Sequence, residues 1–317
     1  MARARGSSLK LAAKSETTYG TAATGNYKLL PCFTCELSAT QALTQDNVLS
    51  TALVGRDAAD PNQDIIEVQG NVRVPIDLDN FGQWCFWLFG AATVVDATPD
   101  FTHTWKSGTT SLTSFTAEKG LTDAAVYFLY TGAKANTMAV DFSPAGSADA
   151  TIGLFGQDEA NSGSTGAGTP TVATLTRFRR NQGTVKKDGS SLANVVGGTF
   201  TFSNGLEPVR TIRSDLQLEG VDEGISTGSG TVTLRFADAT MIADAIAQTP
   251  RALEFAYTLA SNKSVTFTFP RVMFGRPGVP VTGPGGIEIA VPFTAAHDAS
   301  AACLLSVVLK NQTAAYA

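Results

Sequence analysis

Four cysteines are the residues whose spacing most readily suggests chemistry. Cys32-Phe-Thr-Cys35 has the CxxC spacing of metal and redox sites. In a strand, however, residues three apart point to opposite faces, and Cys35 alternates with Phe33 and Leu37 on an apolar face. No second CxxC occurs, so a core role is the favoured interpretation. The other two cysteines lie in apolar segments and are expected as small core residues: Cys85 and Cys303.

The two histidines give little support to catalysis. His103 alternates with Phe101 and Trp105, which favours a packed histidine on a strand face. His297 precedes Asp298, but no nucleophile motif accompanies this pair. The sequence also lacks the motifs of P-loop proteins, zinc proteases and deaminases. We therefore expect no enzyme, cofactor or metal site.

Positive charge is concentrated in one stretch, which holds Arg177, Arg179, Arg180, Lys186 and Lys187. It could contact nucleic acid, or it could be a solvated surface or one that meets an acidic neighbouring subunit. The second interpretation is favoured because the net charge of the chain is −5, and avid nonspecific nucleic-acid binding depends on clustered positive charge.

The composition predicts a folded, strand-rich chain. A length of 317 residues suits about two domains, and 43% hydrophobic residues can form a sizeable core. Charged residues make up 16%, fewer than long surface helices usually carry. The first sixteen residues lack the apolar run of a signal peptide, and the aromatic block 81–89 is too short to span a bilayer. We expect assembly in a host cytoplasm and no contact with a membrane.

Alternation with a period of two is typical of half-buried strands, and it recurs along the chain. It is clearest in EVQGNVRVPIDL at 67–78, where the even positions are mostly apolar. Helical periodicity favours only two short helices, at about 80–90 and 240–248. Asp79 and Asp238 are predicted to cap them, since a short carboxylate can accept the first free amides of a helix.

The two halves of the chain resemble each other. GNVRVPIDLDNF at Gly70 matches GTVTLRFADATM at Gly230 in its apolar positions, and each strand leads into a short helix. The stretch between the halves is rich in Gly, Ser and Thr, which is typical of a linker. The sequence thus predicts a mainly β fold of two tandem sandwich- or barrel-like domains, 1–160 and 176–317, joined by a linker at 161–175.

A family resemblance rests on several short motifs in a fixed order. KSETTYGTA (14–22) resembles a signature of tail tube proteins from long-tailed, siphovirus-like bacteriophages. LLPCFTCELS, VQGNVRV with its helix, FTHTW (101–105) and SFTAEKG (114–120) follow in the order of that family. The second half matches chiefly through its resemblance to the first.

The resemblance implies a virion structural protein that assembles into stacked rings, forming the hollow tube through which the phage genome is ejected. Rings of this family carry six tube domains, so two domains in one chain imply a trimer with pseudo-sixfold symmetry. The alternative is a hexamer in which one domain of each chain decorates the tube. The family also implies tail terminator, tape measure and distal tail proteins as partners. Double-stranded DNA would pass through the channel without sequence preference.

Two sets of residues are expected to carry these roles. The polar face of strands 67–78 and 230–236 is predicted to line the channel, with Glu67, Gln69, Asn71, Asp77, Thr231 and Thr233 facing DNA. Arg73 and Arg235 share that face and fit a DNA passage only if they pair with acids. The polar loops 40–64 and 204–228 are expected to join stacked rings, through Gln45, Asp46, Arg56, Asp57, Arg210, Arg213 and Asp215. The terminal segments 1–28 and 306–317 are expected as arms that brace neighbours.

Two other classes stay open. Another phage-tail or surface β-sandwich that binds carbohydrate or protein would share the Thr- and Gly-rich, acidic composition, but it should show an exposed aromatic platform. A hydrolase would need a convergent nucleophile and base, and the sequence does not provide that pair.

Overall fold

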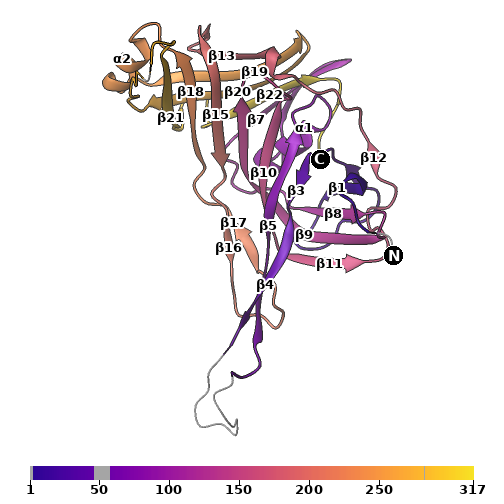
Figure 1. Cartoon of the computed structure of the whole chain (residues 1–317). Helices are drawn as coiled ribbons and strands as arrows, with labels where there is room; N and C mark the ends of the chain where they lie inside the picture. The colour runs from indigo at the N-terminus through magenta and orange to yellow at the C-terminus, as the bar shows by residue number, and fades with distance from the viewer. Residues whose placement is uncertain (1–2, 46–57, 282) are drawn as a thin grey trace.

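Long antiparallel strands dominate the chain, as the alternating sequence predicts (Figure 1). The computed structural model describes residues 3–45, 58–281 and 283–317. Its strands are β1 (Leu9–Ser15), β2 (Lys28–Leu29), β3 (Thr34–Cys35), β4 (Ser38–Thr44), β5 (Asn62–Pro75), β6 (Thr93–Ala97), β7 (Asp100–Lys106), β8 (Phe115–Leu121), β9 (Val126–Phe142), β10 (Asp149–Gly156), β11 (Asp158–Ser162), β12 (Thr171–Val172), β13 (Gly183–Lys187), β14 (Ser190–Ser191), β15 (Val195–Ser203), β16 (Glu207–Val209), β17 (Gly220–Asp222), β18 (Thr227–Arg235), β19 (Arg251–Ala260), β20 (Lys263–Phe274), β21 (Glu288–Ala295) and β22 (Ser306–Asn311). The helices are α1 (Phe81–Phe89), α2 (Thr240–Ala247) and the 3₁₀ turns Gly6–Ser8 and Arg180–Gln182.

One continuous sheet, the long sheet, contains strands from both halves of the chain. Within the described residues its order is β4-β5-β10-β9-β15-β18-β21-β20, and neighbouring strands are antiparallel. β9 from the first half pairs directly with β15 from the second. The halves are therefore joined by main-chain hydrogen bonds as well as by side-chain packing.

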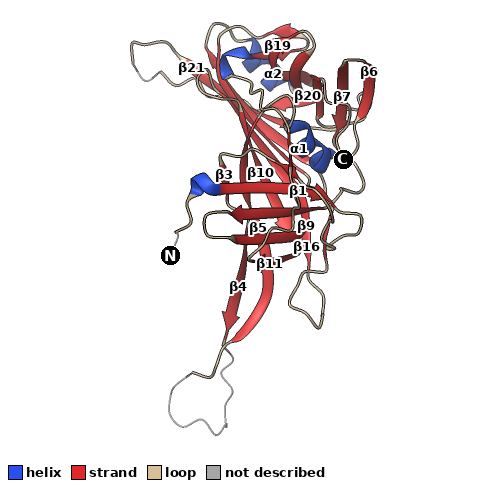
Figure 2. Cartoon of the chain, turned by 90° about the vertical axis from the view of Figure 1, so that its right-hand side faces the viewer, coloured by secondary structure: helices blue, strands red, loops and turns tan. Residues whose placement is uncertain are grey.

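Two smaller sheets cross the ends of the long sheet. The first cross sheet has the order β2-β1-β8-β9-β11, and the second has β13-β19-β20-β22-β7-β6. The long strands β9 and β20 each belong to the long sheet at one end and to a cross sheet at the other. Figure 2 shows the first cross sheet lying across the strands of the long sheet. Over the residues that the structure describes, the sheets stay open, so the architecture is sandwich-like and mainly β, with two short helices, as predicted.

The strand order repeats between the halves. β4-β5-β10-β9 in the first half corresponds to β15-β18-β21-β20 in the second, and β1-β8-β9-β11 corresponds to β13-β19-β20-β22. A short helix follows β5 and another follows β18. A single hydrophobic cluster runs through both halves, so the boundaries at 160 and 176 stay a prediction.

Two glycines occupy the same position in the repeat. A Cβ atom at Gly70 would lie 2.4 Å from the carbonyl oxygen of Glu36, in the link between β3 and β4 beside β5. A Cβ atom at Gly230 would lie 2.2 Å from the carbonyl oxygen of Thr199, on the strand beside β18. Only glycine permits these close approaches, which explains why the sequence match between the halves centres on Gly70 and Gly230.

Helix α1 is short and apolar because nearly every face of it is buried. Trp84 and Trp87 pack edge to face with ring centroids 5.3 Å apart, and Trp87 stacks on Phe115 at 4.0 Å. Aromatic pairs of this geometry add stability beyond the area they bury. The Trp87 indole also donates to Ser15 Oγ at 3.0 Å, which satisfies its buried N–H group. The helix thus ties β1 and β8 to the core.

The predicted caps need one correction. The carboxylate at the start of α1 is that of Asp77 rather than Asp79, and it accepts the main-chain amides of Asn80 and Phe81, each at 3.0 Å. Asp77 also accepts the side-chain amide of Asn80 at 2.7 Å. For α2 the prediction is confirmed in substance, since Asp238 Oδ1 accepts the amide of Thr240 at 2.8 Å.

The terminal segments and the linker form more contacts with the rest of the chain than expected. β1 pairs with β8 over seven residues, and β22 pairs with both β20 and β7. The prediction of arms that brace neighbours is therefore wrong for 9–15 and 306–311, which complete the chain's own sheets. In the linker, the amides of Gly166 and Ala167 donate to the carboxylate of Glu118, and Ala167 is buried.

Candidate functional site

The exposed side of the long sheet is a continuous face of small and polar side chains, here called the polar face. Residues directly opposite each other on paired strands point to the same side of a sheet. One row across six strands reads Arg73, Thr151, Ala139, Thr201, Ser229 and Thr294. The row beside it points into the core and reads Val72, Ile152, Met138 and Phe202, all fully buried. This alternation makes one side of the sheet polar across these strands.

Three arginines on the polar face are paired with acids. Arg73 Nε lies 2.7 Å from Asp149 Oδ2, and the hydrogen bond with this carboxylate raises the pKa of the Arg73 guanidinium. Arg180 lies between Asp141 and Asp149, at 2.8 and 3.0 Å. At the other end of the sheet, Arg235 Nε lies 3.8 Å from Glu288 Oε1. Both arginines that had to pair with acids, Arg73 and Arg235, therefore do so.

Five of the six residues predicted to line a channel lie on the polar face. Gln69 and Asn71 are exposed on β5, Glu67 is half-buried beside them, and Thr231 and Thr233 are half-buried on β18. The long sheet brings these two strands onto one surface, with β10, β9 and β15 between them.

The prediction is wrong for Asp77, whose side chain has 0% exposure beneath α1. β5 ends at Pro75, so the parity that places odd-numbered residues on the polar face no longer holds at position 77. Sequence reasoning also missed Thr137, Thr151, Thr199 and Thr201. The alternation of Thr199 and Thr201 with buried phenylalanines was a usable signal for the last two.

Two hairpins extend from one end of the molecule, as Figure 1 shows for β4–β5 and β16–β17. Gln45, at the outer end of β4, donates through Nε2 to the carbonyl of Ala59 at 2.8 Å. Arg210 forms an ion pair with Glu67 of β5. The other three residues expected in the first of these loops lie outside the described residues: Asp46, Arg56 and Asp57.

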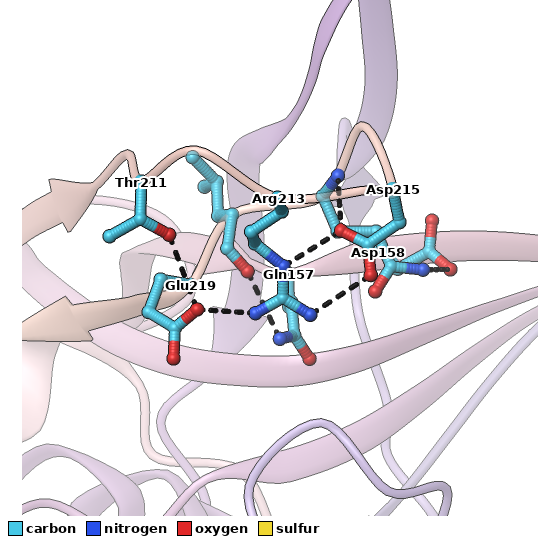
Figure 3. A network of polar contacts seen from close by, with 8 residues as sticks. Gln157, Asp158, Thr211, Arg213, Asp215 and Glu219 are labelled. Carbon is cyan, nitrogen blue, oxygen red and sulfur yellow. Dashed lines mark hydrogen bonds and ion pairs between the residues drawn. The ribbon is translucent and has the colours of Figure 1, made fainter.

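The loop between β16 and β17 is stabilised by its own polar network (Figure 3). Arg213 Nε lies 2.7 Å from Asp215 Oδ1, and the same guanidinium contacts Glu219. The hydrogen bond with Arg213 holds the pKa of the Asp215 carboxyl below its usual range. Gln157 Nε2 donates to the carbonyl of Leu218 at 3.0 Å, which fixes the loop to the body. The loop therefore presents its charges in a defined arrangement.

The basic stretch 177–187 is largely neutralised within the chain. Arg180 pairs with two aspartates of the long sheet, as described above. Lys186 Nζ lies 2.7 Å from Glu254, and Lys187 Nζ lies 2.7 Å from Asp244. Pairing of three of the five cations favours the interpretation of a structural surface over a nucleic-acid patch.

The cysteines and His103 occupy packed positions. Cys32 and Cys35 are half-buried against the core, and burial raises the pKa of the Cys32 thiol to about 11. A thiol with so high a pKa is a poor nucleophile at neutral pH. His103 lies between Phe101 and Trp105, and its Nε2 is 2.8 Å from the carbonyl oxygen of Thr313. Among the described residues, no three His, Cys, Asp or Glu side chains converge as metal ligands, and no helix is long and apolar enough to cross a membrane.

The N-terminal motif has a structural role that its residue types explain. The Glu16 carboxylate is buried and accepts hydrogen bonds from Ser114 Oγ at 2.7 Å, Thr116 Oγ1 at 2.9 Å and the amide of Gly132 at 2.8 Å. It also accepts the amide of Gly20, four residues along the motif. A buried carboxylate requires such partners. The motif therefore anchors β1 to β8 and β9.

Comparison with known proteins gives a family assignment. A family model described as phage tail tube protein matches residues 6–295, which is most of the chain. No curated protein matches the sequence at a significant level. The order of the motifs from Glu16 to Glu118 agrees with this assignment, and so does the mainly β fold. The chain belongs to the phage tail tube protein family, whose members are structural components of the virion tail that assemble into a tube.

Proposed function

We propose that three copies of the chain close the long sheet into a ring, and that stacked rings form the conduit for phage DNA. The polar face would line the channel. The observation that carries this proposal is the long sheet itself, to which each half contributes four strands with a common polar side. Two equivalent halves in one sheet are what a pseudo-sixfold ring of three chains requires.

The strand count sets the width of the ring. Three copies of the eight strands of the long sheet give 24 strands. With a strand spacing of about 4.8 Å and a tilt of about 40°, such a closed sheet would be roughly 50 Å across between facing backbones. Barrels of 16–18 strands already leave an aqueous channel, so a 24-stranded one would be open.

The same count favours the trimer over the hexamer. In the hexameric alternative one half of each chain would decorate the outside of the tube. The β9–β15 pairing places both halves in one sheet, so six copies would give 48 strands and a ring roughly 100 Å across. A decorating half would require this pairing of six residues to break.

The chemistry of the polar face suits a passage for DNA. Threonine, serine, asparagine and alanine offer no fixed positive charge, and Arg73, Arg180 and Arg235 are paired with acids. Duplex DNA carries about one negative charge per 1.7 Å, so unpaired cations in the wall would retain it. A neutral wall would let it slide without sequence preference.

The hairpins β4–β5 and β16–β17 would join one ring to the next. They extend in the same direction from the body, and the second is stabilised by the Arg213 network (Figure 3). Tail terminator, tape measure and distal tail proteins would bind the tube ends, and assembly would take place in the host cytoplasm before the tube joins a long-tailed virion.

A deletion in the first hairpin tests the stacking role. In a variant whose residues 45–62 are replaced by a Gly-Ser turn, we expect rings or monomers in negative-stain microscopy and no long tubes. An unchanged unfolding temperature would show that the rest of the chain still folds. Normal tubes from this variant would exclude the hairpin from stacking.

The competing function is a β-sandwich that binds carbohydrate or protein. It would be favoured by monomers in the same microscopy experiment. The positions of the aromatic side chains argue against this function, because the largest of them are buried in the core and do not form a surface platform.

A further inference from the structure

The two halves of the chain are joined by the pairing of β9 with β15. Each of these two partners resembles a second segment of the chain, but within the described residues the two second segments do not pair with each other. Residues 137–142 of β9 pair antiparallel with residues 198–203 of β15, with Ala139 opposite Thr201 and Val140 opposite Phe200. The amide of Asn204 extends this ladder to the carbonyl of Asn136 at 2.8 Å. If the halves are equivalent, each partner in this junction has a counterpart elsewhere in the chain.

The counterpart of β15 is the segment 35–40. Cys35 lies opposite Val72 of β5, just as Gly198 lies opposite Val232 of β18. Ser38 lies opposite Gln69, just as Thr201 lies opposite Ser229. One side of β15 is covered by β9, whereas the segment 35–40 pairs with β5 alone among the described residues.

The counterpart of the paired end of β9 is the segment 276–281. Phe274 lies opposite Phe293 of β21, as Ala135 lies opposite Leu154 of β10, and the amide of Gly275 continues the ladder to Pro292. β9 carries one extra residue at Asn136, where its register with β10 shifts. With Gly275 taken as the counterpart of Asn136, residues 276–281 match 137–142. In this chain they form no strand, and Val279 and Val281 are 38% and 69% exposed.

We propose that residues 276–281 of one copy add as a strand to the outer edge of residues 35–40 of the next copy. This inference rests on the proposed ring and assigns its chain-to-chain contact. Transferring the register of the internal junction places Leu37 opposite Val279 and Ser38 opposite Gly278. The ring then contains the same contact six times, three times within chains and three times between them.

The main-chain groups fit this register. The amide of Ala39 points away from β5, where it donates to Glu159 Oε2 at 3.2 Å, so Leu37 on the same edge also presents its amide and carbonyl outward. Val279 and Val281 would supply amides and carbonyls to this edge. Pro280 falls opposite Glu36, whose amide already donates to the carbonyl of Asn71 on β5. The N–H group that Pro280 lacks is therefore not needed at the contact. Pro277, opposite Ala39, removes one donor.

Side chains cover this edge in the single chain. The Tyr130 hydroxyl donates to the carbonyl of Leu37 at 3.0 Å, Lys119 donates to the same oxygen, and Glu159 holds the Ala39 amide. Uncovered strand edges pair indiscriminately, and proteins protect them with charges and prolines. Glu159 on one edge, with Pro277 and Pro280 on the other segment, would limit pairing to the neighbour in the correct register.

A pair of engineered cysteines tests the register. Ser38 and Gly278 would form a non-hydrogen-bonded pair, whose Cα atoms are about 4.5 Å apart, within the range of a disulfide. In a C32A/C35A background, Ser38→Cys with Gly278→Cys should give disulfide-linked dimers and trimers, with trimers as the largest species, when preformed tubes are oxidised. Gly278 has no atom within 4 Å of an added Cβ, so the substitution leaves the fold intact.

Matched controls come from the same sheet. Ala139→Cys with Thr201→Cys is the equivalent pair inside one chain and should cross-link in the monomer. Ser38→Cys with Val279→Cys is shifted by one residue and points to opposite faces, so its yield should be at least several-fold lower. In a separate variant, Val279→Pro removes the amide aimed at Leu37 and should leave monomers.

The possible outcomes distinguish a wrong register from a wrong ring. Tubes in which the Ser38/Gly278 cysteines stay unlinked while the internal control cross-links would overturn the register and leave the proposed tube standing. Tubes from Val279→Pro would do the same. Absence of tubes from the C32A/C35A background and from the unaltered chain would reject the proposed function, and the inference with it.

Discussion

Replacing Gly70 or Gly230 with alanine tests the equivalence of the two halves on which the ring is built. The new methyl group at Gly70 would lie 2.4 Å from Glu36 O and 2.7 Å from Leu37 Cα, where ordinary contacts begin at 3.4 Å. At Gly230 it would lie 2.2 Å from Thr199 O. Because the opposing atoms are main chain, neither clash can be relieved by turning a side chain. The neighbouring strand would have to move by about 1 Å, a form of overpacking that costs about 1–3 kcal/mol.

The loss is measurable as a lower unfolding temperature. The unfolding entropy is about 2.1 cal/mol/K per residue, so in this chain of 317 residues a 2 kcal/mol loss predicts a fall in Tm of about 3 °C for each variant. Circular dichroism of the dilute, unassembled protein is the assay. Gly220→Ala is the control, since no atom lies within 4 Å of its added Cβ, and we expect a shift within about 0.5 kcal/mol. Unchanged Tm values for Gly70→Ala and Gly230→Ala, or a loss in one of them alone, would refute the equivalence.

Two further predictions concern buried carboxylates. Asp77→Ala leaves the first amides of α1 without a partner, and we expect a loss of roughly 3–5 kcal/mol of unfolding free energy in urea titrations, against less than about 1 kcal/mol for Asp79→Ala. Similar losses for both would show that Asp77 is not the cap. Burial opposes ionisation of Asp244, but hydrogen bonds with Arg251 and Lys187 outweigh it and hold the pKa of this carboxyl below its usual value. Because the pKa is depressed in the folded state, the stabilisation by Asp244 is present above the ordinary value of about 3.9 and is lost as the pH falls through the folded value. The difference in unfolding free energy between the chain and Asp244→Asn should therefore be largest near neutral pH and shrink toward about pH 2; a difference that does not change with pH would count against the ion pairs.

Local patterns predicted the elements well because their causes are local. The alternation around Gly70 gave β5, and the aromatic block after Asn80 gave α1, since a strand with one buried side and a buried helix both leave a direct trace in the sequence. The matching pattern at Gly230 gave β18 and α2. The family resemblance then supplied the function that these patterns alone did not carry.

Long-range features could not be predicted in the same way. No sequence pattern near Thr137 or Thr151 indicates that β9 and β10 lie between β5 and β15, because strand order is decided by pairings between distant segments. The position of Asp77 depended on where β5 ends, and a three-residue error in that end placed Asp77 in a predicted channel although it caps a helix. Residues 306–311 pair with β20 and β7 of their own chain, and no feature of the segment itself indicates these partners.

The arrangement of chains in the tube is best measured by a density map of tubes assembled from the purified chain, at a resolution that shows side chains. We expect three chains in each ring, with Gln69, Asn71, Thr201 and Thr231 pointing toward the axis and the long sheet continuing from one chain into the next. Six chains in a ring, or these side chains on the outer surface of the tube, would contradict this expectation.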